Sequence, residues 1–485
     1  MTAVAPDASV PSIAQALLDP EIWALIATIN AALALLAAGL ASVHALLTKR
    51  DSRAAWGWIA TCWLFPLAGP TLYYLFGINR LQPQPLPNAP TAPGLDPLAI
   101  TPVCERSMAE QVRVGQRLTG LLPVPGNRID VLHNGEEAYP AMLRAIADAR
   151  CSIRVCTYIF KVGASADRFI AALATAQARG VDVLVLVDGM AELLFAGRIR
   201  QRLRKLNVPT ARFLKPGLFP PMLRLNTRIH RKLLIIDDSV AFTGGMNIRD
   251  RQMLKPPRPD STSDLHFRLS GPVVAPLAAI FARDWQFTTG EALPDAVPAE
   301  AAGGSACRPV TTGPNEDLEK LTVLLIAAIG SAHRRVLIMT PYFIPTLSLL
   351  AVLEAAALRG VAVDIVLPAR SDQRYVDRAS RRFQQALLLR GAAIWLQPAP
   401  FAHGKLFIVD DHYLLLGSAN LDQRSLRLNF ELVVEVFDPA VVAQLALHVV
   451  DIRRRSLRVD AAELRARSLP TRLLDGLCWL FSPYL

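Results

Sequence analysis

The sequence predicts an α/β protein with two related α/β/α domains behind an N-terminal anchor of two transmembrane helices. Two uncharged stretches near the N-terminus predict the anchor, and a strand, helix and strand order that occurs twice predicts the domains. The 485 residues leave room for both parts, because single domains usually contain about 100 to 200 residues.

The first uncharged stretch, residues 22–48, is long enough to cross a bilayer. The second runs from Ala54 to Asn79, with tryptophans near its start and tyrosines towards its end, as expected at two membrane interfaces. The alternative is a cleaved signal peptide followed by a buried core helix. It fits less well, because the first stretch is too long for a signal-peptide core and no basic segment precedes it. We therefore expect a multi-pass anchor.

The membrane side of the body stays open. The loop between the two stretches carries Lys49, Arg50 and Arg53, and the positive-inside rule would place it in the cytoplasm and the body on the other side. The six cysteines show no CxxC pair and no short metal-binding spacing. We therefore expect neither a zinc site nor a disulfide framework, which favours a reducing compartment for the body.

Two stretches rich in proline divide the chain further. The first has few charges and separates the anchor from the body, and the second, also rich in Ala and Gly, divides the body into two parts. The expected boundaries are an N-terminal tail at 1–21, two transmembrane helices at 22–80, a Pro-rich linker at 81–105, a first domain at 106–291, a linker at 292–315, and a second domain with a C-terminal tail at 316–485.

The two parts of the body have the same order of predicted elements, namely an apolar strand, a helix that ends in Arg-Gly, and another apolar strand. The strands are Cys151–Phe160 and Val181–Asp188 in the first part, and Arg335–Ile344 and Val361–Pro368 in the second. Strands that alternate with helices favour α/β layers, and the repetition predicts two domains related by a pseudo-two-fold axis.

Each part then reaches the motif HxKxxxxD, and a turn of small residues that ends in Asn follows it. The first copy contains His230, Lys232, Asp237 and Asn247, and the second contains His403, Lys405, Asp410 and Asn420. In a strand, residues i and i+2 share a face, so His and Lys point into one cleft and the residue between them points away. A neutral imidazole can attack phosphorus while an ammonium and an amide hold the other oxygens, so no metal or cofactor is expected.

The net charge of +11 indicates an anionic partner, which a nucleic acid or an acidic lipid surface would both provide. The uncharged stretches favour lipid. An accidental match would account for one copy of the motif, but not for two copies at corresponding places in a wider repeat.

The doubled motif resembles the HKD motif of the phospholipase D superfamily, and the resemblance covers nearly the whole chain. In detail the chain is most similar to bacterial cardiolipin synthases, at Phe242–Ile248, Gly417–Ser425, Leu428–Glu431 and the ending Phe481–Leu485. Two positions depart from the pattern. Gly245 replaces the Ser of the general GSxxN motif, as is common in the cardiolipin synthase branch. Gly404 stands where that branch often has Ala, which we expect to be harmless on an outward-facing position.

The resemblance implies that one histidine attacks the phosphodiester of phosphatidylglycerol and forms a phosphatidyl-histidine, while the other protonates the departing glycerol. The roles then reverse as a second phosphatidylglycerol attacks, which gives cardiolipin. His230 is the preferred nucleophile, although the sequence fits either histidine. The resemblance also implies phosphate binding by Lys232, Lys405, Asn247 and Asn420, and a positioning role for Asp237 and Asp410.

Each attacking imidazole also needs a carboxylate at its far nitrogen, to fix the tautomer and to stabilise the charged form. The candidates are Asp264 and Glu431, which lie at similar distances beyond the two motifs on the next predicted strand. The alternative is that both are ordinary charges at strand edges.

The implied partners are an anionic phospholipid, phosphatidylglycerol, and the bacterial inner membrane, with no nucleic acid. Phosphatidylethanolamine as one of the two lipids and the oligomeric state stay open. A hydrolytic phospholipase D would use the same motif residues with water as the acceptor. An HKD-type nuclease would explain the charge but leave the two uncharged stretches without a purpose. A non-catalytic membrane scaffold is disfavoured because both motifs are intact.

Overall fold

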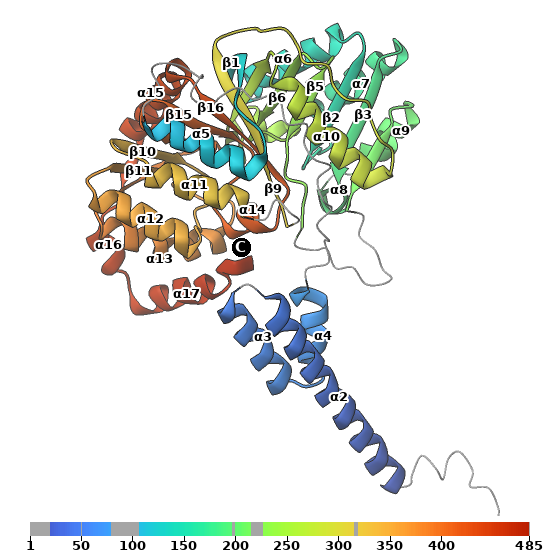
Figure 1. Cartoon of the computed structure of the whole chain (residues 1–485), viewed down its shortest axis with the longest axis vertical. Coiled ribbons are helices and arrows are strands. Elements are labelled where there is room, and N and C mark those ends of the chain that lie inside the picture. The colour runs from blue at the N-terminus through green and yellow to red at the C-terminus, as the bar shows by residue number, and fades with distance from the viewer. Residues whose placement is uncertain are drawn as a thin grey trace, which may run out of the picture. The chain divides into compact units, whose positions relative to one another are not determined.

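The computed structural model describes residues 20–49, 51–78, 106–195, 199–214, 227–314 and 319–484. These residues belong to two compact units, an N-terminal helical unit and a body that begins at residue 106 (Figure 1). Most of the expected tail at 1–21 and all of the expected linker at 81–105 lie outside the described residues.

The N-terminal unit contains one long apolar helix and one interrupted segment. Among the described residues, α2 (Pro20–Thr48) is the one helix long and apolar enough to cross a membrane, with a mean hydropathy of 2.1. The second spanning helix that the sequence predicted is not continuous. Instead α3 (Ser52–Leu64), α4 (Ala68–Leu72) and the π-helical turn η1 (Tyr73–Gly77) follow one another. Pro66 lies at the break. It interrupts the helix because proline has no N–H to donate and its ring crowds the preceding turn.

Polar groups of the N-terminal unit bond to one another. His44 Nδ1 lies 2.7 Å from the Tyr73 hydroxyl, and Trp63 Nε1 donates to Ser42 Oγ at 3.0 Å. Such pairs satisfy polar atoms within an apolar surface and hold the interrupted segment against α2.

The body is built on one mixed sheet. In their order across the sheet, its strands are β17 (Leu457–Arg458), β12 (Ala393–Gln397), β11 (Ala362–Pro368), β10 (Arg335–Met339), β14 (Leu406–Val409), β15 (Tyr413–Gly417), β16 (Glu431–Phe437), β9 (Ser305–Thr312), β1 (Val124–His133), β8 (Leu265–Ser270), β6 (Val240–Gly244), β5 (Leu233–Ile236), β2 (Ser152–Thr157), β3 (Asp182–Asp188) and β4 (Thr210–Phe213).

The strand order is the same on both sides of the central antiparallel pair, β1 and β9. Outward from β1 lie three antiparallel neighbours, β8, β6 and β5, and then β2, β3 and β4, which are parallel to one another. Outward from β9, β16, β15 and β14 are antiparallel, and β10, β11 and β12 are parallel, with β17 as an additional edge strand. We call the two sides the first half and the second half.

Helices cover the sheet of each half. In Figure 1, α7 and α10 lie beside β2 and β3, and α11, α12 and α13 lie beside β10 and β11. The helices of the body are α5 (Arg106–Thr119), α6 (Asn134–Asp148), α7 (Ala164–Ala178), α8 (Gly189–Phe195), α9 (Ile199–Lys205), α10 (Val274–Thr289), α11 (Lys320–Gly330), α12 (Leu347–Leu358), α13 (Arg374–Leu388), α14 (Gln423–Arg427), α15 (Pro439–Arg455), α16 (Ala461–Arg465) and α17 (Leu469–Leu480), with the 3₁₀ turns η3 (Asp250–Gln252) and η4 (Ser482–Tyr484).

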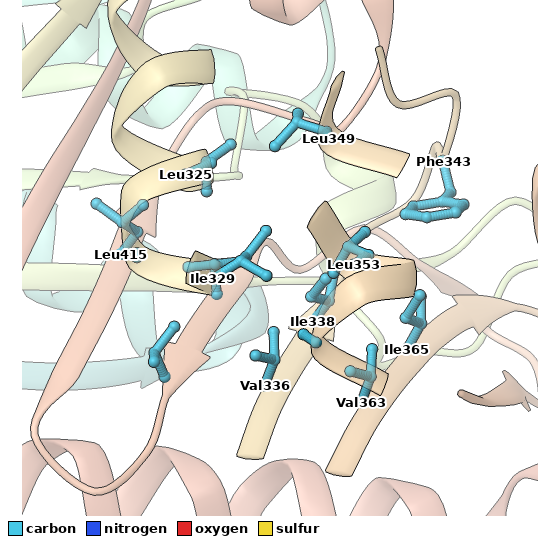
Figure 2. Close-up of a cluster of buried hydrophobic side chains, with 14 of the residues drawn as sticks. Leu325, Ile329, Val336, Ile338, Phe343, Leu349, Leu353, Val363, Ile365 and Leu415 are labelled. Atoms are coloured by element: carbon cyan, nitrogen blue, oxygen red, sulfur yellow. The ribbon is translucent and has the colours of Figure 1, made fainter. Parts of the chain in front are cut away.

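Each half has its own hydrophobic core. Figure 2 shows the core of the second half, where leucines and isoleucines of α11 and α12 pack onto valines and isoleucines of β10 and β11. Val336 and Ile338 on β10, and Val363 and Ile365 on β11, are at most 3% exposed. Because residues i and i+2 of a strand share a face, both strands present one apolar face to the helices. These cores hold the parallel strands that precede the two motifs.

Two expected boundaries are wrong in detail. The expected linker at 292–315 contains β9, which is buried at all but one of its positions because β16 and β1 flank it in the middle of the sheet. The expected first domain begins with α5, but α5 packs on the second half. There Val112 enters the core, and the fully buried Arg308 of β9 donates to the carbonyls of Val112 and Leu121 at 3.0 and 3.1 Å.

The C-terminal tail packs on the body through α17, which contacts α13. The Arg382 guanidinium lies 4.2 Å from the centre of the Trp479 ring, and Arg378 is 3.2 Å from the Asp475 carboxylate. The other face of α17 carries exposed large apolar side chains, namely Leu469, Leu473, Leu474, Leu477 and Leu480, with Phe481 after them.

Candidate active site

Each histidine lies three residues before a strand, in a segment that hydrogen-bonds to the opposite half. His230 precedes β5, and its N–H donates to the carbonyl of Phe430 in the second half at 2.8 Å. His403 precedes β14 and follows β13 (Phe401–Ala402), which pairs in parallel with β7 (Thr262–Ser263) of the first half. The His403 N–H donates to the Ser263 carbonyl at 2.8 Å. Thus the two motifs meet where the halves join.

The carboxylate partners are exchanged between the halves. His230 Nδ1 lies 2.8 Å from Glu431 Oε2, and His403 Nδ1 lies 2.7 Å from Asp264 Oδ2. Each histidine therefore bonds the carboxylate that follows the other motif. With Nδ1 donating to a carboxylate, Nε2 keeps its lone pair and can attack or accept a proton. All four side chains are buried.

The two lysines lie in the same buried cluster. Lys232 Nζ donates to the His230 carbonyl at 2.5 Å, and Lys405 Nζ donates to the His403 carbonyl at 2.6 Å and lies 3.2 Å from His403 Nε2. Burial lowers the pKa of Lys232 to about 7 and that of Lys405 to about 8. The negative charge of a phosphate bound between the two lysines would raise their pKa values and so favour the protonated ammonium form.

Burial also keeps the imidazoles neutral. It lowers the pKa of His230 to about 4 and holds the pKa of His403 well below its usual value, with the positive charges of Lys405 and Arg249 acting in the same direction. The charge of His230 also contributes to the lowering at His403, which places the two rings in one electrostatic unit. A neutral imidazole with a free Nε2 is the form that attacks phosphorus.

The two carboxylates have different surroundings. Ser418 Oγ donates to Glu431 Oε2 at 2.6 Å, whereas Gly245 occupies the corresponding place beside Asp264. Burial acts to raise the pKa of Glu431, but His230, Lys232 and the Ser418 hydrogen bond together hold it below its usual value. Burial raises the pKa of Asp264 to about 6. Glu431 is thus the more firmly ionised of the two.

Both asparagines of the motifs are buried beside the histidines. Asn247 Oδ1 accepts from the Ile159 N–H at 3.0 Å, which leaves its amide nitrogen available to an oxygen of a bound phosphate. Asn420 Nδ2 lies 3.2 Å from Asp422 Oδ2, and its Oδ1 has no partner among the described residues.

The aspartates of the motifs do not reach the cluster of histidines and lysines. They stand at the far ends of β5 and β14, where the Asp237 carboxylate accepts from the N–H groups of Arg150, Cys151 and Ser152 at 2.7 to 2.8 Å. The Asp410 carboxylate accepts in the same way from residues 333–335 at 2.8 to 3.0 Å. Both bind the start of the neighbouring strand, so their positioning role acts on the backbone and not on the substrate.

Replacing Asp237 by Ala is therefore expected to lower stability by about 2 kcal/mol, because three charge-assisted hydrogen bonds are lost at a partly exposed site. The midpoint of thermal unfolding should fall, while the catalytic rate of the folded enzyme stays near that of the wild type. Asp238→Ala is the matched control, because Asp238 also has a positive φ, at 49°, but does not bind the start of β2. An unchanged midpoint together with a lost rate would contradict this assignment.

The residue between His and Lys was expected to face outward in each motif, but Arg231 and Gly404 are both buried. Arg231 is 3% exposed, pairs with Asp284 on α10 and donates from Nε to the Glu431 carbonyl at 3.2 Å. Gly404 is buried too, and a Cβ there would meet the end of the Met339 side chain at 3.1 Å. The intervening position points away from the cleft but into the protein, because the sheet is covered on that side.

Gly245→Ala is expected to reduce the catalytic rate by about tenfold or more, whereas Gly404→Ala should change it by less than about twofold. A Cβ at residue 245 would stand 2.2 Å from Asp264 Oδ1, so the carboxylate that holds His403 must move. The contact at residue 404 is the flexible end of Met339, which can yield. Initial rates of both variants, normalised to folded protein, test the pair. Wild-type activity in Gly245→Ala would contradict the close packing.

Three further residues of the site were not singled out from the sequence. Ser418 lies in the small-residue turn, and its role depends on Glu431, which is distant in sequence. The Tyr158 ring meets the His230 ring edge to face at 5.0 Å, and Lys232 Nζ lies 5.5 Å from its centre. Arg249 contributes positive charge at both lysines and at His403. The available signal for Tyr158 was the string Thr157-Tyr158-Ile159-Phe160, which Thr340-Pro341-Tyr342-Phe343 repeats in part. Arg249 has no counterpart in the second half, where Asp422 stands at the matching position.

A doubled HxK motif with paired carboxylates, built at the junction of two α/β halves, defines the phospholipase D superfamily. The family model described as "Cardiolipin synthase, PLD-like domain" matches residues 142–285 and 325–449, and the model "Phospholipase_D-nuclease N-terminal" matches residues 36–77. The chain belongs to the cardiolipin synthase family of this superfamily.

Cardiolipin synthases of other bacteria are similar to this chain over almost its full length. The chain is 31% identical to Cardiolipin synthase A of Shigella flexneri over 473 residues, which cover 93% of this chain and 96% of the relative. It is also 31% identical to Cardiolipin synthase A of Proteus mirabilis, with the same coverage. Among solved structures, phosphatidylserine synthase of Haemophilus influenzae matches with a TM-score of 0.62 and 17% identity, over 78% of this chain and 100% of that one. This last likeness shows the fold.

Proposed function

We propose that this enzyme joins two phosphatidylglycerol molecules into cardiolipin and releases glycerol, through a phosphatidyl-histidine intermediate. The observation that carries the proposal is the buried cluster in which each histidine has a carboxylate at Nδ1 and a lysine beside it. Family membership and near full-length similarity to cardiolipin synthases support the reaction class.

In the first step, His230 Nε2 attacks the phosphorus of one phosphatidylglycerol, and the P–O bond to the headgroup glycerol breaks. Lys232, Lys405 and the amides of Asn247 and Asn420 hold the nonbridging oxygens as negative charge develops. The ionised Glu431 stabilises the positive charge that forms on His230. His403 enters this step in its protonated form, which the Asp264 carboxylate at Nδ1 and the negative charge of the bound phosphate favour. Its Nε2 proton passes to the departing glycerol oxygen, which leaves His403 neutral.

In the second step, His403 takes the proton of a terminal hydroxyl of the second phosphatidylglycerol. That oxygen attacks phosphorus, a new P–O bond forms, and the P–N bond to His230 breaks. The same histidine thus gives a proton in the first step and takes one in the second, which closes the cycle.

The assignment of His230 as the nucleophile has support from the carboxylates. Glu431 is the more firmly ionised because it accepts the Ser418 hydrogen bond as well, so it suits the histidine that must carry a full positive charge. Gly245 stands beside Asp264 where Ser418 stands beside Glu431, so no side-chain hydroxyl from this position donates to Asp264. Asp264 therefore suits the histidine that exchanges a proton.

The two halves are best interpreted as two phospholipase D-like domains related by a pseudo-two-fold axis near the β1 and β9 pair. The shared strand order around that pair supports this interpretation. The boundaries at 106–291 and 316–485 then need two changes, because α5 packs with the second domain and β9 starts it.

We place the enzyme in the bacterial inner membrane, with α2 as a spanning helix and the segment from α3 to η1 as a second pass broken at Pro66. The exposed apolar residues of that segment support this, since Trp56, Trp63 and Leu64 are 73, 52 and 73% exposed. The exposed leucine face of α17 would suit the lipid surface as well.

The test uses purified enzyme in mixed micelles with phosphatidylglycerol that carries label in its diacylglycerol part, without added nucleotide. Cardiolipin and free glycerol in equal amounts are the expected products, as resolved by mass spectrometry. Phosphatidic acid as the sole labelled product would instead establish hydrolysis with water as the acceptor. Adding phosphatidylethanolamine shows whether a second lipid class replaces one of the two substrates.

A further inference from the structure

Arg249 lies on the segment that carries the first asparagine of the site. It follows Asn247 by two residues in extended backbone, with φ −164° and ψ 152°. Alternate side chains of an extended segment point to the same side, so Arg249 lies on the same side of the segment as Asn247. Its positive charge acts on His403 and on both lysines. The Tyr139 hydroxyl fixes this segment, because it donates to the Asn247 carbonyl at 2.7 Å and accepts from the Arg249 N–H at 3.1 Å.

The guanidinium of Arg249 is not used by the described part of the protein. Its Nε is buried without a partner there, and neither a hydrogen bond nor an ion pair of the guanidinium is found among the described residues. The acids whose negative charge acts on Arg249 bind other groups. Asp264 holds His403, and Asp372 accepts from the Tyr342 hydroxyl at 2.6 Å and lies 3.6 Å from Arg251. A largely buried cation that forms no ion pair is costly, so this position favours an anionic ligand.

The corresponding residue after the second motif is an acid. The residue two positions after Asn420 is Asp422, which is buried and accepts from the Ser425 N–H at 2.7 Å. The two motifs therefore differ at this position, with Arg249 after the first asparagine and Asp422 after the second, and both charges act on Lys405. A donor phosphate held by both motifs does not account for an arginine on one motif alone, whereas a second phosphate bound beside that arginine does.

We propose that Arg249 binds the phosphodiester of the acceptor phospholipid, on the His403 side of the cleft. The inference rests on the proposed function, because only an acceptor that is itself a phospholipid brings a second phosphate. With that phosphate at Arg249, the terminal hydroxyl of the acceptor headgroup lies within reach of His403. The hydroxyl proton passes to His403 Nε2, the hydroxyl oxygen bonds to phosphorus, and the P–N bond to His230 breaks. Arg249 selects the acceptor and takes no part in cleaving the donor.

The test compares two reactions that share the phosphatidyl-histidine. One is cardiolipin formation from phosphatidylglycerol, and the other is the exchange of labelled glycerol into phosphatidylglycerol, where the acceptor is uncharged. Arg249→Gln is expected to lower the ratio of cardiolipin formation to glycerol exchange by about 10- to 100-fold. Arg249→Lys, which keeps the charge and guards against a folding defect, should lower it less. The control Arg258→Gln, at an arginine 3.8 Å from Asp250 with 47% of its side chain exposed, should keep the wild-type ratio.

A third acceptor separates phosphate recognition from recognition of acyl chains. sn-Glycero-3-phosphoglycerol carries the phosphodiester without the chains, and transfer to it should fall in Arg249→Gln as cardiolipin formation does. Unchanged transfer to this acceptor would overturn the proposal, because Arg249 would then act on the lipid part. An equal fall in glycerol exchange would also overturn it and assign Arg249 to the donor phosphate. If the wild type neither makes cardiolipin nor exchanges glycerol, the proposed function itself is wrong.

Discussion

Replacement of either histidine by alanine is expected to lower phosphatidyl transfer by about 10⁴-fold or more, yet only His403→Ala should accumulate a covalent phosphatidyl adduct. His230 keeps Glu431 and Lys232 in that variant, so it can still attack phosphorus slowly. The adduct then persists because its removal needs His403 as the base. In His230→Ala the nucleophile is absent.

The measurement is incubation with phosphatidylglycerol labelled in the diacylglycerol part, followed by denaturation at alkaline pH, which preserves phosphohistidine, and peptide mapping. Label should appear on the peptide that contains His230. The double variant His230→Ala/His403→Ala sets the background. Label on His403 in the His230→Ala variant would reverse the two roles while leaving the reaction class unchanged.

Glu431→Gln is expected to reduce the rate of transfer by about 10²- to 10⁴-fold. Gln is nearly the same size but carries no charge, so it neither fixes the Nδ1–H tautomer of His230 firmly nor stabilises the charged adduct. In the wild type the Ser418 hydroxyl donates to the Glu431 carboxylate at 2.6 Å, and in the variant the same hydroxyl faces the side-chain amide of Gln. Pre-steady-state formation of the covalent adduct should be the step that slows.

Asp264→Asn is the matched comparison, because it affects His403 and should slow the removal of the adduct more than its formation. Glu463→Gln, at an exposed residue of α16, controls for the charge change and should leave both steps unchanged. More than about a tenth of the wild-type rate in Glu431→Gln would rule out the assigned role of this carboxylate.

Much of the site was predictable because its parts are local in sequence. His230 and Lys232 share a face by the alternation of an extended chain, and the repeated motif identified His403 and Lys405 in the same way. Asp264 and Glu431 followed from their similar positions after the motifs. Their exchange between the halves was not predictable, because it joins residues that are 139 and 201 positions apart. That pairing depends on how β1 meets β9 and β7 meets β13, which no local pattern encodes.

The errors in the fold have similar physical causes. The composition of the second apolar stretch predicted a spanning helix, but hydropathy does not weigh the missing N–H of Pro66. The segment at 292–315 has a linker-like composition, and only long-range pairing with β16 makes residues 305–312 a central strand. Arg249 escaped notice because a single arginine after a motif has no distinguishing pattern until its lack of a partner is known.

The exchange of carboxylates also has a consequence for how the enzyme is made. In a nascent chain the N-terminal helical unit and the first motif are synthesised long before the second half of the body is complete. Glu431 is synthesised 201 residues after His230, which corresponds to about 10 to 40 s at usual rates of synthesis. During that interval His230 has no carboxylate at Nδ1, so the incomplete chain lacks an activated nucleophile. Catalysis starts only when β16 is in place, so chains that stop early are inert towards the membrane that holds them.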